Sequence, residues 1–86
     1  MLVFVGPGLG SVAFVAGRRV GGAVVRNRAR RILRAAWREL APRVRHGYDI
    51  AFVARRAAIR GAKTQDVVAE MDDLLARAGV LLVRSP

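Results

Sequence analysis

The sequence predicts a small α/β (α+β) domain built as a two-layer sandwich, with helices on one face of a short sheet. Three observations support this fold class. Two short apolar runs near the N-terminus are separated by glycine and proline, a central segment has helical apolar spacing, and a third apolar run precedes a second amphipathic segment. The predicted element order is therefore β, β, α, β, α. With 86 residues, 53% of them hydrophobic, the chain can form one core, so residues 1–86 are predicted to be a single domain.

The first two strands are predicted from the uncharged opening segment, MLVFVGPGLGSVAFVAG. Leu2–Val5 is apolar and β-branched, GPGLG supplies turn residues, and Ser11–Ala16 is the return strand. We therefore predict a hairpin with a loop of about five residues. The segment is too short for a transmembrane helix and is interrupted by Pro7 and four glycines. Because it also lacks the basic start of a secretory signal, we expect a soluble, unprocessed chain.

The segment Arg26–Leu40 predicts an amphipathic helix, which Ala41–Pro42 ends because the residue before a proline resists the helical conformation. Its apolar face consists of Ala29, Ile32, Leu33, Ala36 and Leu40. Its opposite face consists of Asn27, Arg30, Arg31, Arg34 and Arg38. Trp37 lies at the boundary between the two faces. The polar face is therefore almost purely arginine.

A third strand and a second helix are predicted in the C-terminal half. Tyr48–Ala54 is an almost continuous apolar run, as expected of a strand covered on both faces. The second helix is expected to have Thr64 as its N-cap and to stop at Gly79. Its apolar stripe consists of Val67, Val68, Met71, Leu74, Leu75 and Ala78. The last residues, VLLVRSP, are expected to pack back on the domain.

The charge of the chain indicates a polyanion partner. Sixteen basic residues, all but one of them arginine, stand against six acidic ones, which gives a net charge of +10. The signs are also segregated. Arg18–Arg45 contains ten basic residues and one acid, whereas the second predicted helix contains four of the six acids. One helix is thus expected to present a cationic surface and the other an anionic one, which a uniformly solvated coat would not do.

RNA fits this cationic surface better than a membrane or DNA. The apolar face of the first helix is small and rich in alanine, which suits packing on a sheet better than insertion into lipid. A DNA-reading face mixes asparagine, glutamine and serine with arginine. Here Asn27 is accompanied only by arginine, which binds backbone phosphate and shape. We therefore expect an RNA partner, no DNA and no membrane.

The residues do not predict an autonomous nuclease. Such an enzyme needs a general base, a nucleophile or clustered metal ligands. The chain has no cysteine and a single histidine, His46, in a basic loop. Asp72 and Asp73 are adjacent on a helix and point about 100° apart, which is poor geometry for a shared metal. Asp49 starts a strand, where it is expected to cap a turn. We therefore expect no catalytic residue and no metal ligand in this chain.

One long motif carries a resemblance to a known family. GRRVGGAVVRNRARRILRAAWREL closely resembles the signature segment of the bacterial ribonuclease P protein subunit, in which a basic pair leads to an Arg-Asn-Arg box and further basic residues. The residues that match are Arg18, Arg19, Val20, Gly21, Ala23, Val24, Arg26, Asn27, Arg28, Arg30, Arg31 and Arg34. Gly47–Arg55 resembles the following strand of the family and Thr64–Gly79 its last helix. The resemblance extends from about Leu2 to Gly79.

The resemblance implies a fold, a partner and a reaction. The fold is a sandwich with a mixed sheet and a left-handed βαβ crossover, similar to domain 2 of ribosomal protein S5. The partners are ribonuclease P RNA and precursor tRNA, in the cytoplasm. The RNA, with Mg²⁺ that it mainly holds itself, removes the 5′ leader, so the chain is part of a ribonucleoprotein endoribonuclease without being its catalyst. The RNA-binding residues are expected to be Arg18, Arg19, Arg26, Asn27, Arg28, Arg30, Arg31, Arg34 and Arg38.

The leader cleft of the family is matched less completely. Phe4 occupies a position where the family tends to place an aromatic residue on the first strand, and it is either a leader contact or a core residue. Phe14 and Phe52 are expected in the core. Gly17 replaces a common serine, and the helical segment that precedes the first strand in the family is absent from the sequence. Three alternatives stay open: a ribosomal-type or chaperone RNA-binding module, a membrane-surface protein, and, last, an autonomous nuclease.

Overall fold

The fold is that of a computed structural model, which describes residues 1–55 and 63–82. The strands are β1 (Leu2–Pro7), β2 (Val12–Ala16) and β3 (Tyr48–Ala54), and the helices are α1 (Ala23–Leu40) and α2 (Thr64–Arg77). Two short 3₁₀ turns, η1 (Arg18–Val20) and η2 (Ala41–Arg43), flank α1. The order of strands and helices is the predicted one.

The predicted hairpin is wrong, because β3 lies between β1 and β2. The sheet order is β1-β3-β2, with β1 antiparallel and β2 parallel to β3. The connection from β1 to β2 therefore crosses two strand spacings, about 10 Å, and four or five extended residues can span that distance. Asp49 holds this connection: its Oδ1 accepts hydrogen bonds from the backbone N–H groups of Leu9, Gly10 and Ser11 at 3.1, 3.1 and 2.9 Å. The expectation that Asp49 caps a turn is confirmed.

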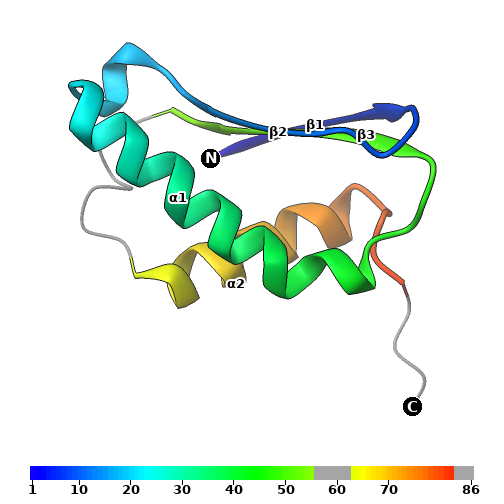
Figure 1. The fold of residues 1–86 in the computed structure, drawn as a ribbon. Helices are drawn as coiled ribbons and strands as arrows, with labels where there is room; N and C mark the ends of the chain where they lie inside the picture. Colours follow the sequence, from blue (N-terminus) through cyan, green and yellow to red (C-terminus); the bar gives the residue numbers. More distant parts are fainter. Residues whose placement is uncertain (56–62, 83–86) are drawn as a thin grey trace.

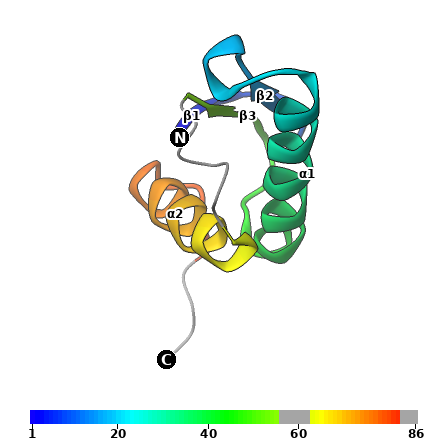
Figure 2. The same cartoon turned by 90° about the vertical axis from the view of Figure 1, so that its left-hand side faces the viewer.

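Both helices cover the same face of the sheet, which confirms the predicted two layers. Figure 1 shows α1 and α2 below the strands, and Figure 2 shows α1 on the β2 side and α2 on the β1 side. The prediction that β3 is covered on both faces is therefore wrong. Its buried residues are Ile50, Phe52 and Ala54, whereas Asp49, Ala51 and Val53 face the uncovered side. Apart from Asp49, the run is apolar on both faces because the uncovered face of the sheet is itself largely apolar.

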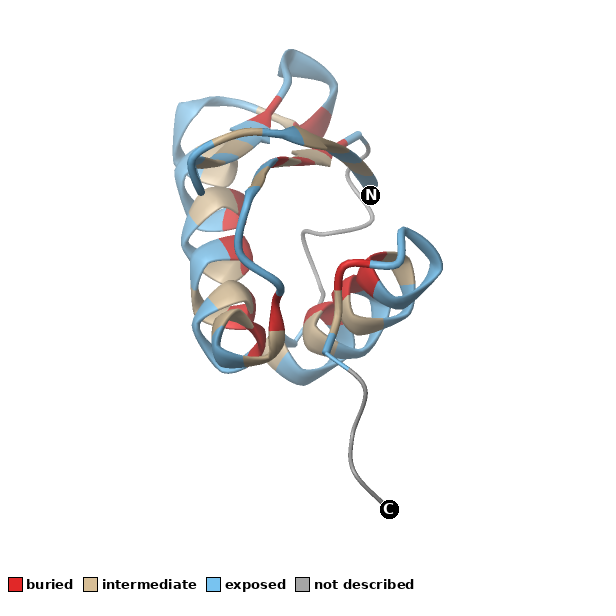
Figure 3. Cartoon of the chain, turned by 90° about the vertical axis from the view of Figure 1, so that its right-hand side faces the viewer, coloured by how far each residue is buried: buried red, intermediate tan, exposed pale blue. Residues whose placement is uncertain are grey.

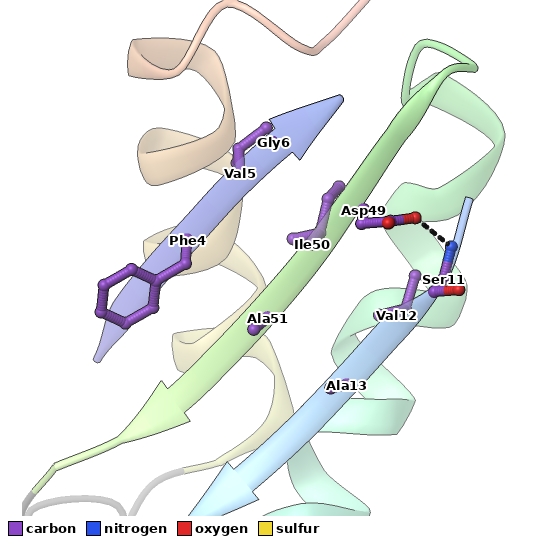
Figure 4. Close-up of a pocket in the computed structure, with 9 residues that line it drawn as sticks. All are labelled: Phe4, Val5, Gly6, Ser11, Val12, Ala13, Asp49, Ile50 and Ala51. Atoms are coloured by element: carbon purple, nitrogen blue, oxygen red, sulfur yellow. Dashed lines mark hydrogen bonds between the residues drawn. The ribbon is translucent and has the colours of Figure 1, made fainter. Parts of the chain in front are cut away.

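β2, α1 and β3 form a βαβ unit between neighbouring parallel strands. In Figure 4, β2 and β3 point in the same direction with α1 behind them, and the crossover is left-handed. Crossovers of this kind are right-handed in about 98% of cases. The unusual hand implied by the family resemblance is thus present here.

The core lies between the sheet and the two helices, where the buried segments in Figure 3 face one another. Phe52, Leu33, Met71 and Leu75 are its largest fully buried side chains. Phe14, predicted in the core, is half-buried and stacks on Phe52, with ring centroids 5.9 Å apart. The predicted apolar stripes are buried or half-buried, except that Ala78 is exposed.

The helix ends differ slightly from their predicted positions. α1 begins at Ala23, one turn before the predicted Arg26, and ends at Leu40 as predicted. The N-cap of α2 is Lys63 rather than Thr64, because the Asp66 carboxylate accepts the Lys63 backbone N–H at 3.2 Å. Gly79 follows the helix with φ +75°, as a C′ glycine does. The predicted packing of the tail is confirmed for Val80, which is buried, and Leu81, which pairs with Val44. Leu82 is exposed, and residues 83–86 of the predicted tail lie outside the described residues.

Candidate nucleic-acid interface

The outer face of α1 collects the arginines of the central segment. Ala29, Leu33, Ala36 and Leu40 are buried against the sheet and α2, and this fixes the rotation of the helix. The residues that consequently face outward are Asn27, Arg28, Arg31, Arg34 and Arg38, and Arg26 and Arg30 are half-buried at the margins. We call these seven residues the α1 cationic face. The structure therefore brings the helical part of the predicted RNA-binding set onto one surface.

No arginine of the α1 cationic face forms an ion pair with an acid in residues 1–55 or 63–82. Arg30 Nη2 instead donates to Asn27 Oδ1 at 2.9 Å, and Arg34 lies over the Phe14 ring, 5.8 Å from its centroid. The Arg26 Nε is buried without a hydrogen-bond partner among the described residues. The positive charge is therefore left for an external anion, since nothing in the described chain neutralises it.

Arg18 and Arg19 extend this face at the N-terminal end of α1. Both are exposed on η1, which Val20 anchors in the core with 0% of its surface exposed. Gly21 follows at φ +149°, and a Cβ there would press on the Val25 side chain, so glycine is required at this close turn. Sequence reasoning gave no role to Val24, which is 80% exposed beside these cations. Its only signal was its place in the motif.

The uncovered face of the sheet carries a second candidate surface, a groove of about 430 Å³. We call it the sheet groove. Its lining residues are Phe4, Val5, Gly6, Ser11, Val12, Ala13, Asp49, Ile50 and Ala51. Figure 4 looks onto this face, with Phe4 projecting from β1 and both helices behind the strands. The groove exists because Gly6, Ala13 and Ala51 are small and because α1 and α2 both lie on the opposite side of the sheet.

Phe4 is 58% exposed, so its alternative reading as a core residue is wrong. It faces Ala51 across the β1–β3 pair and offers an accessible ring beside an apolar floor. Among the described residues that line the groove, Asp49 is the only charged one. Phe4 projects from the face of the sheet opposite to both helices, so the sheet groove and the α1 cationic face lie on different sides of the sheet.

The acids of the described residues are dispersed over structural contacts. Asp72 pairs with Arg43 at 3.2 Å and Asp73 with Arg77 at 3.1 Å, so the two adjacent carboxylates have different partners. No group of three or more His, Asp or Glu side chains within the described ranges could hold a metal ion. His46 is exposed in the loop before β3. Within the same ranges, no helix has the length and apolar character needed to cross a membrane.

Comparison with known proteins identifies the family. The family described as Ribonuclease P matches residues 5–79. The ribonuclease P protein component of Symbiobacterium thermophilum is 50% identical over 70 residues, which are 81% of this chain and 60% of that protein. Its counterpart in Roseiflexus castenholzii is 44% identical over 68 residues, which are 79% of this chain and 56% of that protein.

The fold comparison agrees. The RNase P protein of Thermotoga maritima superimposes with a TM-score of 0.73 over 87% of this chain and 74% of that chain, at 23% identity. The chain spans 56–60% of the length of the two sequence relatives, and the matched part includes the whole α1 cationic face. The chain therefore belongs to the ribonuclease P protein component family.

Proposed function

We propose that this chain acts as the protein component of ribonuclease P, binding the RNA of that enzyme through the α1 cationic face. The observation that carries the proposal is the row of arginines that have no acidic partner in the described chain. Guanidinium groups bind phosphate through parallel hydrogen bonds, and leaving six of them unneutralised on one helix costs stability through repulsion. A phosphate backbone removes that repulsion, which favours a structured RNA as the partner.

The sheet groove is proposed as the site for the single-stranded 5′ leader of precursor tRNA. Its exposed Phe4 ring offers a stacking surface, and its floor is apolar. Since the described lining is apolar apart from Ser11 and the acidic Asp49, the groove favours bases over phosphates. The phosphates of a bound strand would lie toward the flanks of the sheet.

Catalysis is assigned to the RNA partner, together with Mg²⁺ held mainly by that RNA. The described residues offer paired or isolated acids rather than a metal cluster, which supports a positioning role for the protein. The reaction served is endonucleolytic removal of the leader, in the cytoplasm. The protein would contribute by neutralising RNA phosphates and by holding the substrate leader.

The proposal is tested by cleavage of a precursor tRNA by bacterial ribonuclease P RNA at low Mg²⁺, with and without the chain. We expect stimulation that is lost when Arg26, Arg28 and Arg31 are replaced by alanine, a change we call the α1 triple variant. In the matched control, alanine replaces Arg45, Arg55 and Arg77, which are exposed and lie outside α1. This variant loses the same three positive charges as the α1 triple variant. If both variants lost the stimulation of cleavage equally, the effect would depend only on net charge, and the α1 cationic face would not be the RNA-binding surface. RNA binding without stimulation of cleavage would favour the alternative of a non-catalytic RNA-binding module.

The leader site is tested separately with Phe4→Ala. Loss of one stacking surface is expected to weaken binding of precursor tRNA to the assembled enzyme by about 5- to 150-fold, since a base–aromatic stack contributes about 1–3 kcal/mol. Binding of mature tRNA, which has no leader, should not change. Leu9→Ala is the control, because Leu9 is fully exposed outside the groove. An equal effect of Phe4→Ala on both tRNAs would exclude Phe4 from the leader site.

A further inference from the structure

Two arginines of the α1 cationic face are held by neighbouring side chains. Arg34 lies over the ring of Phe14, which belongs to the edge strand β2. Arg30 donates to Asn27 within its own helix. The Nη and Nε donors of Arg28, Arg31 and Arg38 make no hydrogen bond to the described residues. The seven residues of this face are therefore unequal: some guanidinium groups are oriented before any ligand binds.

The Phe14 ring has a fixed position because it belongs to an aromatic stack that extends into the core. Its plane is tilted by only 12° from that of Phe52, and Phe52 contacts Trp37, with ring centroids 5.5 Å apart. Phe52 is fully buried on the central strand, and its neighbour Trp37 belongs to α1, so the stack connects β2 and β3 to that helix. The Phe14 ring is thereby fixed relative to the helix that carries Arg34. A cation over a fixed ring loses less freedom on binding a phosphate than a freely rotating one.

Arg30 and Arg34 are four residues apart, so they are neighbours along the helix surface. Each is held by a contact that leaves guanidinium donors available. We propose that Phe14 and Asn27 are positioning residues, which hold Arg34 and Arg30 as a pre-oriented pair for the phosphate groups of an RNA backbone. The inference rests on the proposed RNA-binding function and goes beyond it, because neither Phe14 nor Asn27 need touch the RNA.

The first test is a double-mutant cycle on binding of ribonuclease P RNA, with Phe14→Leu and Arg34→Ala alone and together. Leucine keeps an apolar side chain in the core and removes the aromatic face. We expect Phe14→Leu to weaken binding about two- to fivefold, the size of a cation–π contact at an exposed site. In the Arg34→Ala background the same change should alter binding by less than about 1.5-fold. Equal weakening in both backgrounds would overturn the proposal.

The salt dependence of binding tests the ligand assigned to Arg34. Loss of one phosphate contact lowers the slope of log K against log[salt] by about one. We expect that reduction for Arg34→Ala and for Arg30→Ala. An unchanged slope in both would mean that neither arginine binds a phosphate. The control is Val3→Ala, a half-buried residue of β1 that packs on the core, which should lower stability and leave RNA affinity unchanged well below the melting temperature.

Asn27→Ala in a cycle with Arg30→Ala tests the second contact. Asn27 is exposed, so the variant is expected to fold normally. We expect it to weaken RNA binding about twofold to fivefold, since the hydrogen bond is exposed, and only when Arg30 is present. An equal effect without Arg30 would show that Asn27 binds the RNA directly and would remove it from the positioning role.

A measurement on the free protein separates this inference from the proposed function. The ring of Phe14 should shift the NMR resonances of the Arg34 Hδ and Hε atoms upfield, and Phe14→Leu should abolish the shift. Absence of the shift in the wild-type chain would contradict pre-orientation, whatever RNA the protein binds. If ribonuclease P RNA does not bind, the proposed function fails. The same cycle measured with poly(U) then decides whether Phe14 acts through Arg34.

Discussion

The two helices carry opposite charges, and they differ in whether those charged side chains have partners within the described chain. On α1, six arginines have no acidic partner among the described residues, and the one acid, Glu39, accepts a hydrogen bond from Gln65. On α2, every acid has a partner. Asp66 caps the helix, Glu70 pairs with the amino group of Met1, Asp72 with Arg43, and Asp73 with Arg77.

This difference teaches that charge segregation in a sequence has two separate meanings. The composition of α2 predicts an anionic surface, yet its carboxylates are used in contacts that hold α2, η2 and the start of β1 together. The arginines of α1 lie on a helix that is also amphipathic, but they form no ion pair with another described element. A helix whose charges are paired internally is a structural element, whereas one whose charges are unpaired is a candidate interface.

The largest expected effect is on RNA affinity. Removal of three phosphate contacts lowers the salt slope by about 2.7, which corresponds to a loss of two to three orders of magnitude in affinity at about 0.1 M salt. We expect this for the α1 triple variant, measured by filter binding to ribonuclease P RNA. The counterpart on α2, Asp66→Asn with Glu70→Gln and Asp73→Asn, should bind RNA as tightly as the wild type. A comparable loss in the α2 variant would remove the distinction between the helices.

The next effect concerns stability in the presence of small anions. Repulsion among the α1 arginines should be relieved by sulfate, which binds the folded chain and so raises its melting temperature. At ten times the dissociation constant the gain is about 1.4 kcal/mol, or about 5–10 °C for a domain of this size. Thermal melts should show this rise for the wild type and a much smaller one for the α1 triple variant. Equal rises would place the bound sulfate elsewhere.

The smallest effects distinguish the acids of α2 from one another. Asp72→Ala should lower the free energy of unfolding by about 1 kcal/mol, because it leaves the partly buried Arg43 without its partner. Asp73→Ala should lower it by less than about 0.5 kcal/mol, since that pair is an exposed contact one helical turn apart. Urea denaturation of both variants measures the difference. A larger effect for Asp73 would mean that partial burial does not strengthen the Arg43 pair.

The local elements were predictable because their signals are local. Apolar spacing fixed the rotation of α1 and thus its arginine face, and Gly79 predicted the end of α2. The order of the strands was not predictable in this way. The hairpin and the observed sheet place nearly the same residues in strands, and they differ mainly in the position of β3. The observed order includes a contact between Asp49 and a loop about 40 residues away, which no local pattern reveals.

The two candidate sites were likewise predictable only where their signals are local. The arginines of α1 were assigned from their spacing and from the motif, and the structure places the helical ones together. The contact of Arg34 with Phe14 was not predicted, and the sequence left Phe4 open between a leader contact and a core residue. Both depend on which side of the sheet the helices cover. An apolar strand residue has the same sequence pattern whether it faces a core or an open groove.

The most direct test of the account is to map which helix lies against the RNA. The chain has no cysteine, so single cysteines at Val24 on α1 and Ala69 on α2, both exposed, can each carry a tethered hydroxyl-radical probe. In the complex with ribonuclease P RNA, we predict localised cleavage of the RNA from position 24 and background cleavage from position 69. Cleavage of equal strength from both positions, or from position 69 alone, would contradict the assignment of α1 as the RNA-binding surface.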